Sequence, residues 1–186
     1  MIIDGKASPI KMILMGKDNI VLVGLMGCGK TSVADELARL SGWEFIDTDA
    51  MIEKEQGMSI SQIFSQKGEP EFRRFERETV EFVAHWKNKI IATGGGIFQD
   101  EQNRKLLLDN GWVFYLRAPV EYLFERTRGD VTRPLLQNAE PLETLRDLLA
   151  KREPFYLQAH HVIDVAQQAP LEIAREIWKC VEKAKA

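Results

Sequence analysis

The feature that most constrains this chain is a glycine-rich loop at residues 24–31, Gly-Leu-Met-Gly-Cys-Gly-Lys-Thr, with an apolar run before it and a segment of helical period after it. Glycines in this pattern let successive backbone N–H groups converge on phosphate oxygens at the positive end of the following helix. Lys30 can then reach the terminal phosphates, and the Thr31 hydroxyl can ligate Mg²⁺. The loop therefore predicts a site for ATP and Mg²⁺, with nucleotide contacts from Gly27, Cys28, Gly29, Lys30, Thr31 and Ser32.

The two cysteines form no recognisable pattern. Cys28 lies inside the loop, where a helix N-terminus and a lysine could make its thiol reactive, or where it could simply fill a tight turn. We favour the second interpretation, because the loop needs only a small side chain there. Cys180 is far away, and neither cysteine has CxxC or metal-ligand spacing. This usage suggests neither a disulfide framework nor a zinc site and fits a reducing cytoplasm.

Short apolar runs of β type alternate with longer segments of helical period along the chain. Such alternation predicts an α/β fold in which helices cover both faces of a parallel sheet. The predicted strands lie at residues 20–23, 43–46, 90–92, 112–116 and 161–163. We therefore expect a three-layer α/β/α fold with a central parallel sheet of about five strands.

Two segments between the predicted strands have their own character. A helix between the second and third strands carries an apolar stripe with charged residues beside it, made of Phe72, Phe75, Thr79, Phe82 and Val83. Residues 128–138 instead break the periodic pattern with Gly, Pro and Asn between two helical stretches. That break predicts a mobile surface loop.

Length and charge narrow the class of protein. With 186 residues, 45% of them hydrophobic, the chain can bury one substantial core but is too short for two ordinary domains. A net charge of −3 without a long basic run gives no reason to expect nucleic acid or a membrane surface as a partner. No segment approaches the roughly 20 apolar residues of a membrane span. We expect a partly disordered extension at residues 1–18, then one domain at residues 19–186, in a cytoplasmic monomer that acts on small molecules.

Two acids follow the second predicted strand, in the run Phe-Ile-Asp-Thr-Asp at residues 45–49. A kinase needs an acidic group to help orient Mg²⁺ and a group to accept the proton of the attacking hydroxyl. Ligands of open parallel sheets bind at the carboxyl ends of strands, and alternation would point Asp47 and Asp49 the same way if strand geometry continued. Alternatively, the two acids are a helix cap and a solvated charge.

A second glycine cluster, Gly94, Gly95 and Gly96, follows the third predicted strand. Three consecutive glycines lose much conformational entropy on folding. That cost is easier to understand where backbone must approach a ligand closely than in a loop that only has to turn. A plain turn remains the alternative interpretation.

Several motifs occur in one order: the loop at 24–31, Asp-Thr-Asp at 47–49, Phe-Arg-Arg-Phe-Glu at 72–76, the triple glycine, Arg-Pro-Leu-Leu at 133–136 and Lys-Arg-Glu-Pro-Phe-Tyr at 151–156. Each later motif is weak alone, but their order within a short chain is specific. Over roughly residues 19–184 the sequence closely resembles shikimate kinase. The resemblance implies transfer of the ATP γ-phosphoryl group to the 3-hydroxyl of shikimate, in the chorismate route to aromatic amino acids.

The resemblance also implies a role for each matched residue. Lys30 would stabilise the transferring phosphoryl group, Thr31 would ligate Mg²⁺ and Asp47 would support the metal through water. Asp49 would hold the acceptor hydroxyls and serve as the base. The acceptor would lie against a segment at residues 49–83.

The carboxylate of the acceptor would be bound by two arginines, Arg73 and Arg152, because a planar guanidinium meets a carboxylate with two donors. Gly95, within the triple glycine, would add a backbone donor to the same substrate. Glu76 lies one helical turn after Arg73, so both side chains could face one pocket. Without the family match, this pair would read as an ordinary surface ion pair.

Three further residues are matched toward the nucleotide. Arg133 corresponds to an arginine of a lid at residues 126–138, whose closure would exclude water. Arg126 corresponds to an arginine placed against the adenine ring, and Gln168 falls where the family contacts adenine. A glutamine on a loop is otherwise usually solvated. The histidines His85, His160 and His161 match no family role, and we interpret them as structural or solvated.

Three other functions are alternatives, two of them kinases. A related small-metabolite kinase, such as a gluconate kinase, would share the loop and a carboxylate-binding arginine pair, whereas a nucleoside monophosphate kinase would need a base-specific acceptor pocket that the sequence does not indicate. A noncatalytic nucleotide-binding or switch protein is the other class. The absence of an Asn-Lys-x-Asp motif counts against a GTPase switch.

Overall fold

The structure is a computed structural model that describes residues 17–129 and 140–185. Most of the predicted extension at 1–18, most of the predicted lid at 126–138, and Arg133 therefore lie outside the described residues. Within the described part, none of the helices is long and apolar enough to cross a membrane.

A five-stranded parallel sheet forms the centre of the described part, in the order β2-β3-β1-β4-β5. Its strands are β1 (Asn19–Val23), β2 (Glu44–Asp47), β3 (Lys89–Ala92), β4 (Gly111–Arg117) and β5 (His161–Asp164). Each predicted strand overlaps one of these, so the prediction of about five parallel strands is confirmed. Every residue of β1 is buried, as expected for a central strand covered on both faces.

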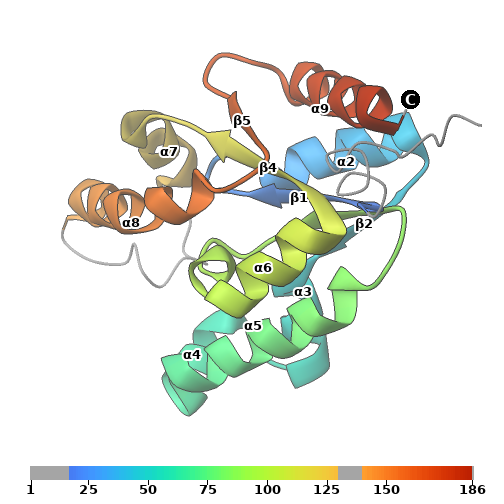
Figure 1. Ribbon diagram of the computed structural model, residues 1–186. Coiled ribbons are helices and arrows are strands. Elements are labelled where there is room, and N and C mark those ends of the chain that lie inside the picture. The colour runs from blue at the N-terminus through green and yellow to red at the C-terminus, as the bar shows by residue number, and fades with distance from the viewer. Residues whose placement is uncertain (1–16, 130–139, 186) are drawn as a thin grey trace, which may run out of the picture.

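Helices surround the sheet in the layers that the sequence predicts (Figure 1). They are α2 (Lys30–Ser41), α3 (Thr48–Gln56), α4 (Ile60–Lys67), α5 (Glu69–Ala84), α6 (Glu101–Asn110), α7 (Val120–Thr127), α8 (Pro141–Tyr156) and α9 (Pro170–Lys185), with a 3₁₀ turn η1 at Ile97–Gln99. Helices α2 and α9 pack together over one face, while α5 and α6 pack together on the other side of the sheet. The prediction of a three-layer α/β/α fold is confirmed.

The order of the strands fixes where a ligand can bind. From β1 the chain crosses to β2 through α2, and it later returns past β3 to reach β4 on the opposite side of β1. The carboxyl end of β1 is therefore the point at which the direction of winding reverses. Open α/β sheets bind ligands at such a point, and the glycine-rich loop follows β1 directly.

The buried residues of the described part form two hydrophobic clusters. The larger joins the sheet to its covering helices and includes β1 residues such as Leu22 and Val23. The smaller contains Ile52, Ile63, Phe72 and Phe75, from α3, α4 and α5. The three helices at residues 48–84 thus carry a small core of their own.

The apolar stripe predicted on α5 is correct except for Phe82. Phe82 is 60% exposed, and its ring packs edge-on against Trp86 with centroids 4.9 Å apart. Val80, which the prediction omitted, is fully buried. Helical periodicity places Phe82 at the margin of the stripe, where the neighbouring elements no longer cover it.

The histidines are explained by local packing in two cases. The N–H of Val113 donates a hydrogen bond to Nδ1 of His160 at 3.0 Å. Burial lowers the pKa of His160 to about 4, with the nearby Lys17 charge acting in the same direction. His161 stacks on Phe114 with ring centroids 5.0 Å apart. Both contacts fit the structural interpretation.

Candidate active site

At its first glycine, the glycine-rich loop passes so close to neighbouring backbone that a side chain would not fit. Gly24 has φ +143°, and a Cβ there would lie 2.7 Å from the carbonyl oxygen of Leu116 in β4. The loop then leads into α2, whose first residue is Lys30. The strand, loop and helix therefore occur in the arrangement that a phosphate-binding loop requires.

Lys30 folds over the loop. Its ammonium donates hydrogen bonds to the carbonyls of Gly24 at 2.8 Å and Leu25 at 3.2 Å. It also lies 3.8 Å from the sulfur of Cys28. These contacts hold the positive charge at the mouth of the loop, where phosphate oxygens would meet the N-terminus of α2.

Cys28 is 3% exposed, and a Cβ on Gly24 would lie 3.0 Å from its sulfur. Its side chain therefore fills the inside of the loop. This burial agrees with the interpretation of Cys28 as a small packing residue.

The acidic pair adopts a different local geometry from the extended one that strand alternation assumed. Strand β2 ends at Asp47, which caps α3: its Oδ1 accepts hydrogen bonds from the N–H groups of Asp49 at 2.9 Å and Ala50 at 3.2 Å. Asp49 lies in the first turn of α3. Even so, Asp47 and Asp49 both line one cavity, so the cap and the site are compatible.

Oxygen ligands suitable for Mg²⁺ are present at the loop. The Thr31 hydroxyl lies 3.5 Å from Oδ2 of Asp47. The described residues contain no group of three or more His, Cys, Asp or Glu side chains that could hold a metal ion. Mg²⁺ in phosphoryl-transfer sites typically uses one or two protein oxygens, with phosphates and water completing its shell. A hydroxyl beside a carboxylate fits that pattern.

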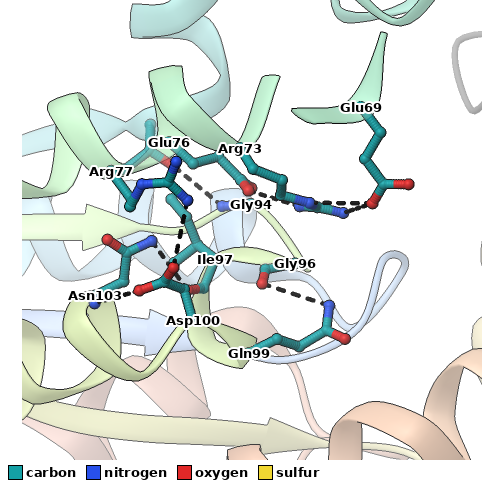
Figure 2. A network of polar contacts seen from close by, with 12 residues as sticks. Glu69, Arg73, Glu76, Arg77, Gly94, Gly96, Ile97, Gln99, Asp100 and Asn103 are labelled. Atoms are coloured by element: carbon teal, nitrogen blue, oxygen red, sulfur yellow. Dashed lines mark hydrogen bonds and ion pairs between the residues drawn. The ribbon is translucent and has the colours of Figure 1, made fainter. Parts of the chain in front are cut away.

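Across the cavity from the loop, α5 presents an ion-pair network (Figure 2). Arg73 donates to Glu76 at 2.6 Å and to Glu69 at 2.8 Å. Glu76 is 2% exposed, so this is no ordinary surface pair. The pKa of Glu76 is raised to about 7, mainly by burial and also by the Asp49 carboxylate, while the charge and hydrogen bond of Arg73 partly offset this rise.

The triple glycine lies against three charged side chains at once. A Cβ on Gly94 would overlap Oδ1 of Asp49, and one on Gly96 would overlap the guanidinium of Arg73. A Cβ on Gly95 would lie only 3.2 Å from Nη1 of Arg152. The glycines therefore allow close approach between backbone and the charged groups, which a plain turn would not require.

The two halves meet in a cavity of about 820 Å³ at the carboxyl end of the sheet. The sequence-predicted residues that line it are Gly27, Gly29, Lys30, Thr31, Ser32, Asp47, Asp49, Arg73, Glu76, Gly94, Gly95, Gly96, Arg126 and Arg152. Residues more than a hundred positions apart thus share one site. It combines the backbone of the glycine-rich loop with three carboxylates and three guanidinium groups of these residues.

The residues matched to adenine differ in their positions. Arg126 lines the cavity, donates through Nε to the carbonyl of Gly27 at 2.9 Å and stacks over the ring of Tyr122. Gln168 is not among the lining residues, and its amide donates to the carbonyl of Asp164 at 2.6 Å. Its role toward adenine stays a prediction.

Residues that the sequence predictions omitted also belong to the site. Phe64 and Phe72 line the cavity, with ring centroids 4.7 Å apart. Thr48 is fully buried, and its hydroxyl accepts a hydrogen bond from the N–H of Gly94 at 3.0 Å. Thr48 stands between two acids already singled out, but a threonine at that position gives no signal of a contact 46 residues away.

A profile of the family described as "Shikimate kinase" matches residues 26–182. A shikimate kinase of Thermodesulfovibrio yellowstonii is 44% identical over 165 residues, which cover 89% of this chain and 95% of that protein. A shikimate kinase of Symbiobacterium thermophilum is 48% identical over 146 residues, which cover 77% and 84% of the two chains.

Comparison with solved structures also finds shikimate kinases. The shikimate kinase of Acinetobacter baumannii in complex with shikimate has a TM-score of 0.88 and 41% identity, covering 95% of this chain and 99% of that one. The enzyme of Aquifex aeolicus has a TM-score of 0.76 and 30% identity, covering 90% and 98%. A gluconokinase of Sinorhizobium meliloti has a TM-score of 0.59 at 20% identity, with 90% and 93% coverage, a likeness of fold alone.

Proposed function

Because the chain belongs to the shikimate kinase family, we propose that it phosphorylates the 3-hydroxyl of shikimate with ATP, yielding shikimate 3-phosphate and ADP. The observation that carries this proposal is the single cavity shared by the phosphate-binding loop and the Asp49, Arg73 and Arg152 set. The loop supports nucleotide phosphates, and the second set supports an acceptor that has both hydroxyl groups and a carboxylate.

On the nucleotide side, the backbone of residues 27–32 and the ammonium of Lys30 bind the phosphates. Phosphoryl transfer is catalysed mainly by positioning and by stabilisation of charge on the phosphoryl oxygens. Lys30 supplies a positive charge at the place where that charge develops. Arg126 approaches the nucleotide from α7, and Gln168 and the lid residue Arg133 complete this half in our proposal.

Thr31 and Asp47 are the residues that would hold Mg²⁺, Thr31 directly and Asp47 through water. Mg²⁺, when bound, neutralises negative charge on the phosphates. The position of Asp47 is fixed by two backbone hydrogen bonds from α3, so its remaining oxygen keeps one orientation toward the loop.

On the acceptor side, Asp49 accepts the proton of the 3-hydroxyl as that oxygen attacks the γ-phosphorus. A bond forms between the acceptor oxygen and phosphorus, the bond from phosphorus to the β,γ-bridging oxygen breaks, and ADP carries the electron pair away. Arg73 and Arg152 bind the carboxylate, with Glu76 holding Arg73 and the backbone of Gly95 donating to the substrate. The segment at residues 49–83 supplies most of this half.

The test is an acceptor panel. Purified protein is incubated with ATP, Mg²⁺ and, separately, shikimate, gluconate or a nucleoside monophosphate, and ADP release is followed by a coupled assay. Shikimate should give the highest kcat/KM, with shikimate 3-phosphate identified by mass spectrometry. A higher value with gluconate, or nucleotide binding without any acceptor-dependent ADP, would contradict the proposal.

We further propose that the protein works in the cytoplasm as a monomer, with residues 19–186 as one domain after the extension at 1–18. A sedimentation experiment at assay concentration should give about the mass of one chain, 21.3 kDa.

A further inference from the structure

Tyr156, the last residue of α8, is a buried tyrosine whose hydroxyl reaches the triple glycine. It is 0% exposed, and its hydroxyl donates a hydrogen bond to the carbonyl of Gly95. The motif at residues 151–156 contains Tyr156, but neither the motif nor the proposed function gives it a task. A fully buried hydroxyl directed at the backbone of a binding site can control the orientation of that backbone.

The hydrogen bond from Tyr156 restrains the peptide between Gly95 and Gly96, which the glycines themselves leave free to rotate. In a trans peptide the carbonyl of Gly95 and the N–H of Gly96 point in opposite directions, so holding one fixes the other. Glycine has no Cβ to limit its dihedral angles, and this turn has three in a row. At the other end, the buried hydroxyl of Thr48 accepts the N–H of Gly94 at 3.0 Å. The turn is thus held by one buried hydroxyl at each end.

The same tyrosine hydroxyl lies against Arg152, which precedes Tyr156 by about one helical turn. Arg152 is 5% exposed, and its Nη1 lies 3.2 Å from where a Cβ of Gly95 would be. Burial raises the pKa of Tyr156, while the charge of Arg152 and a hydrogen bond from it act in the opposite direction. Tyr156 therefore contacts Arg152, which the proposed function directs at the substrate carboxylate, and the carbonyl of Gly95, whose backbone N–H the proposed function directs at the substrate.

The neighbouring Tyr115 provides a matched comparison. Its ring packs on that of Tyr156 with centroids 5.1 Å apart, and it is 1% exposed. Its hydroxyl, however, donates to Glu153 at 3.1 Å and not to the turn. The two tyrosines thus share burial and ring packing but differ in what their hydroxyls hold.

We propose that Tyr156 is a positioning residue for the acceptor carboxylate, whose hydroxyl, with Thr48 at the other end of the turn, fixes the Gly95–Gly96 peptide relative to the guanidinium of Arg152. This inference rests on the proposed function, because it concerns the carboxylate half of that site.

The first experiment compares Tyr156→Phe with Tyr115→Phe. Each change removes one buried hydroxyl and keeps the aromatic ring. Tyr156→Phe should raise KM for shikimate roughly 10-fold, the effect of losing one hydrogen bond, with kcat and KM for ATP within about twofold of the wild type. Tyr115→Phe should leave all three constants within about twofold. Equal effects of the two variants on shikimate KM would overturn the inference.

The second experiment measures the turn itself by amide hydrogen exchange in the ligand-free proteins. Tyr156→Phe should speed exchange at the peptide covering residues 93–98, and Tyr115→Phe should not. If Tyr156→Phe does not fold, Thr48→Val tests the same restraint from the other end, with faster exchange and a raised shikimate KM expected. Unchanged exchange and unchanged KM in the folded variant would overturn the inference.

These results separate two failures. A wild-type protein without shikimate-dependent turnover would overturn the proposed function and this inference with it. Wild-type turnover with a Tyr156→Phe variant that behaves like Tyr115→Phe would overturn the inference alone.

Discussion

Two carboxylates, Asp49 and Glu76, lie together beside Gly94, and their environments suit them to different tasks. A Cβ on Gly94 would overlap Oδ1 of Asp49 and would lie 3.3 Å from Oε1 of Glu76. Glu76 is paired with Arg73 at 2.6 Å. Asp49 lines the cavity from the first turn of α3, where a proton from an acceptor hydroxyl can reach it.

Replacing Asp49 by asparagine tests the role of base. Asparagine keeps the shape of the side chain but cannot accept the proton, so kcat should fall by about 100-fold or more. ADP affinity, measured by titration calorimetry, should change less than about twofold, because the loop is untouched. Asp35→Asn, which changes an exposed carboxylate of α2 outside the lining residues, is the matched control. An unchanged kcat in Asp49→Asn would remove Asp49 as the base.

The buried Glu76 predicts a pH dependence of stability. Its pKa is about 7 in the folded protein, against an ordinary 4.5, so the folded state binds this proton more tightly than the unfolded chain does. Below pH 4.5 the group is protonated in both states and has no effect. As the pH rises from about 4.5 to about 7, Glu76 therefore lowers the free energy of unfolding, by up to about 3 kcal/mol.

Urea unfolding of the wild type and Glu76→Gln at pH 5 and pH 8 measures this effect. Relative to the wild type, Glu76→Gln should be more stable at pH 8 than it is at pH 5, because glutamine has no proton to lose. Glu69→Gln, which removes the 60% exposed partner of the same Arg73, should show a smaller change. A difference that is constant with pH, or that changes in the opposite direction, would contradict the prediction.

At the scale of elements, the turn after β3 lets α5 approach the sheet. Gly96→Ala should displace the Arg73 guanidinium, because the added Cβ would lie 2.9 Å from its Cζ. KM for shikimate should therefore rise about 10-fold or more, the effect of losing one arm of a bidentate charged contact. KM for ATP, determined in the same assays, is the internal control. A parallel rise in both constants would point to general damage instead.

The elements themselves were largely predictable from the sequence. Buried parallel strands are continuous apolar runs, so all five strands were found, with boundaries shifted by one residue or so. The prediction that Phe82 belongs to the buried stripe was wrong. Periodicity gives the direction of a side chain but not how far the neighbouring elements extend to cover it. Asp47 caps α3 instead of continuing the extended strand, because α3 begins directly after it. Its side chain accepts hydrogen bonds from N–H groups of the first helical turn, which otherwise lack partners within the helix.

Some parts of the candidate site could be predicted from the residues themselves, and others only from the family resemblance. The phosphate loop follows from residue chemistry alone, since its glycines, lysine and threonine all lie within residues 24–31. The acceptor half came from resemblance, because Asp49, Arg73 and Arg152 lie far apart in sequence and meet only in the fold. Thr48 and Tyr156 lie within motifs that carried the resemblance, but no role was predicted for them, because their hydroxyls act through single contacts with distant glycines.

At the scale of the whole molecule, the acceptor half of the cavity has a small core of its own, although α5 also contributes Val80 and Val83 to the large cluster. The loop and β1 belong to the large cluster that includes the sheet, whereas α3, α4 and α5 enclose the small cluster of Ile52, Ile63, Phe72 and Phe75. Of that small cluster, Phe72 also lines the cavity. A defect in one core should therefore affect one ligand more than the other.

Ile63→Ala and Leu107→Ala test this separation. Ile63 is 0% exposed in the small cluster and Leu107 is 1% exposed in the large one, so each truncation should lower the free energy of unfolding by about 2–5 kcal/mol. Only Ile63→Ala should weaken shikimate binding in calorimetric titrations, because α3 and α5 carry Asp49 and Arg73. ADP binding should stay within about twofold in both. If both truncations weakened shikimate binding equally, the acceptor helices would depend on the large core as much as on their own.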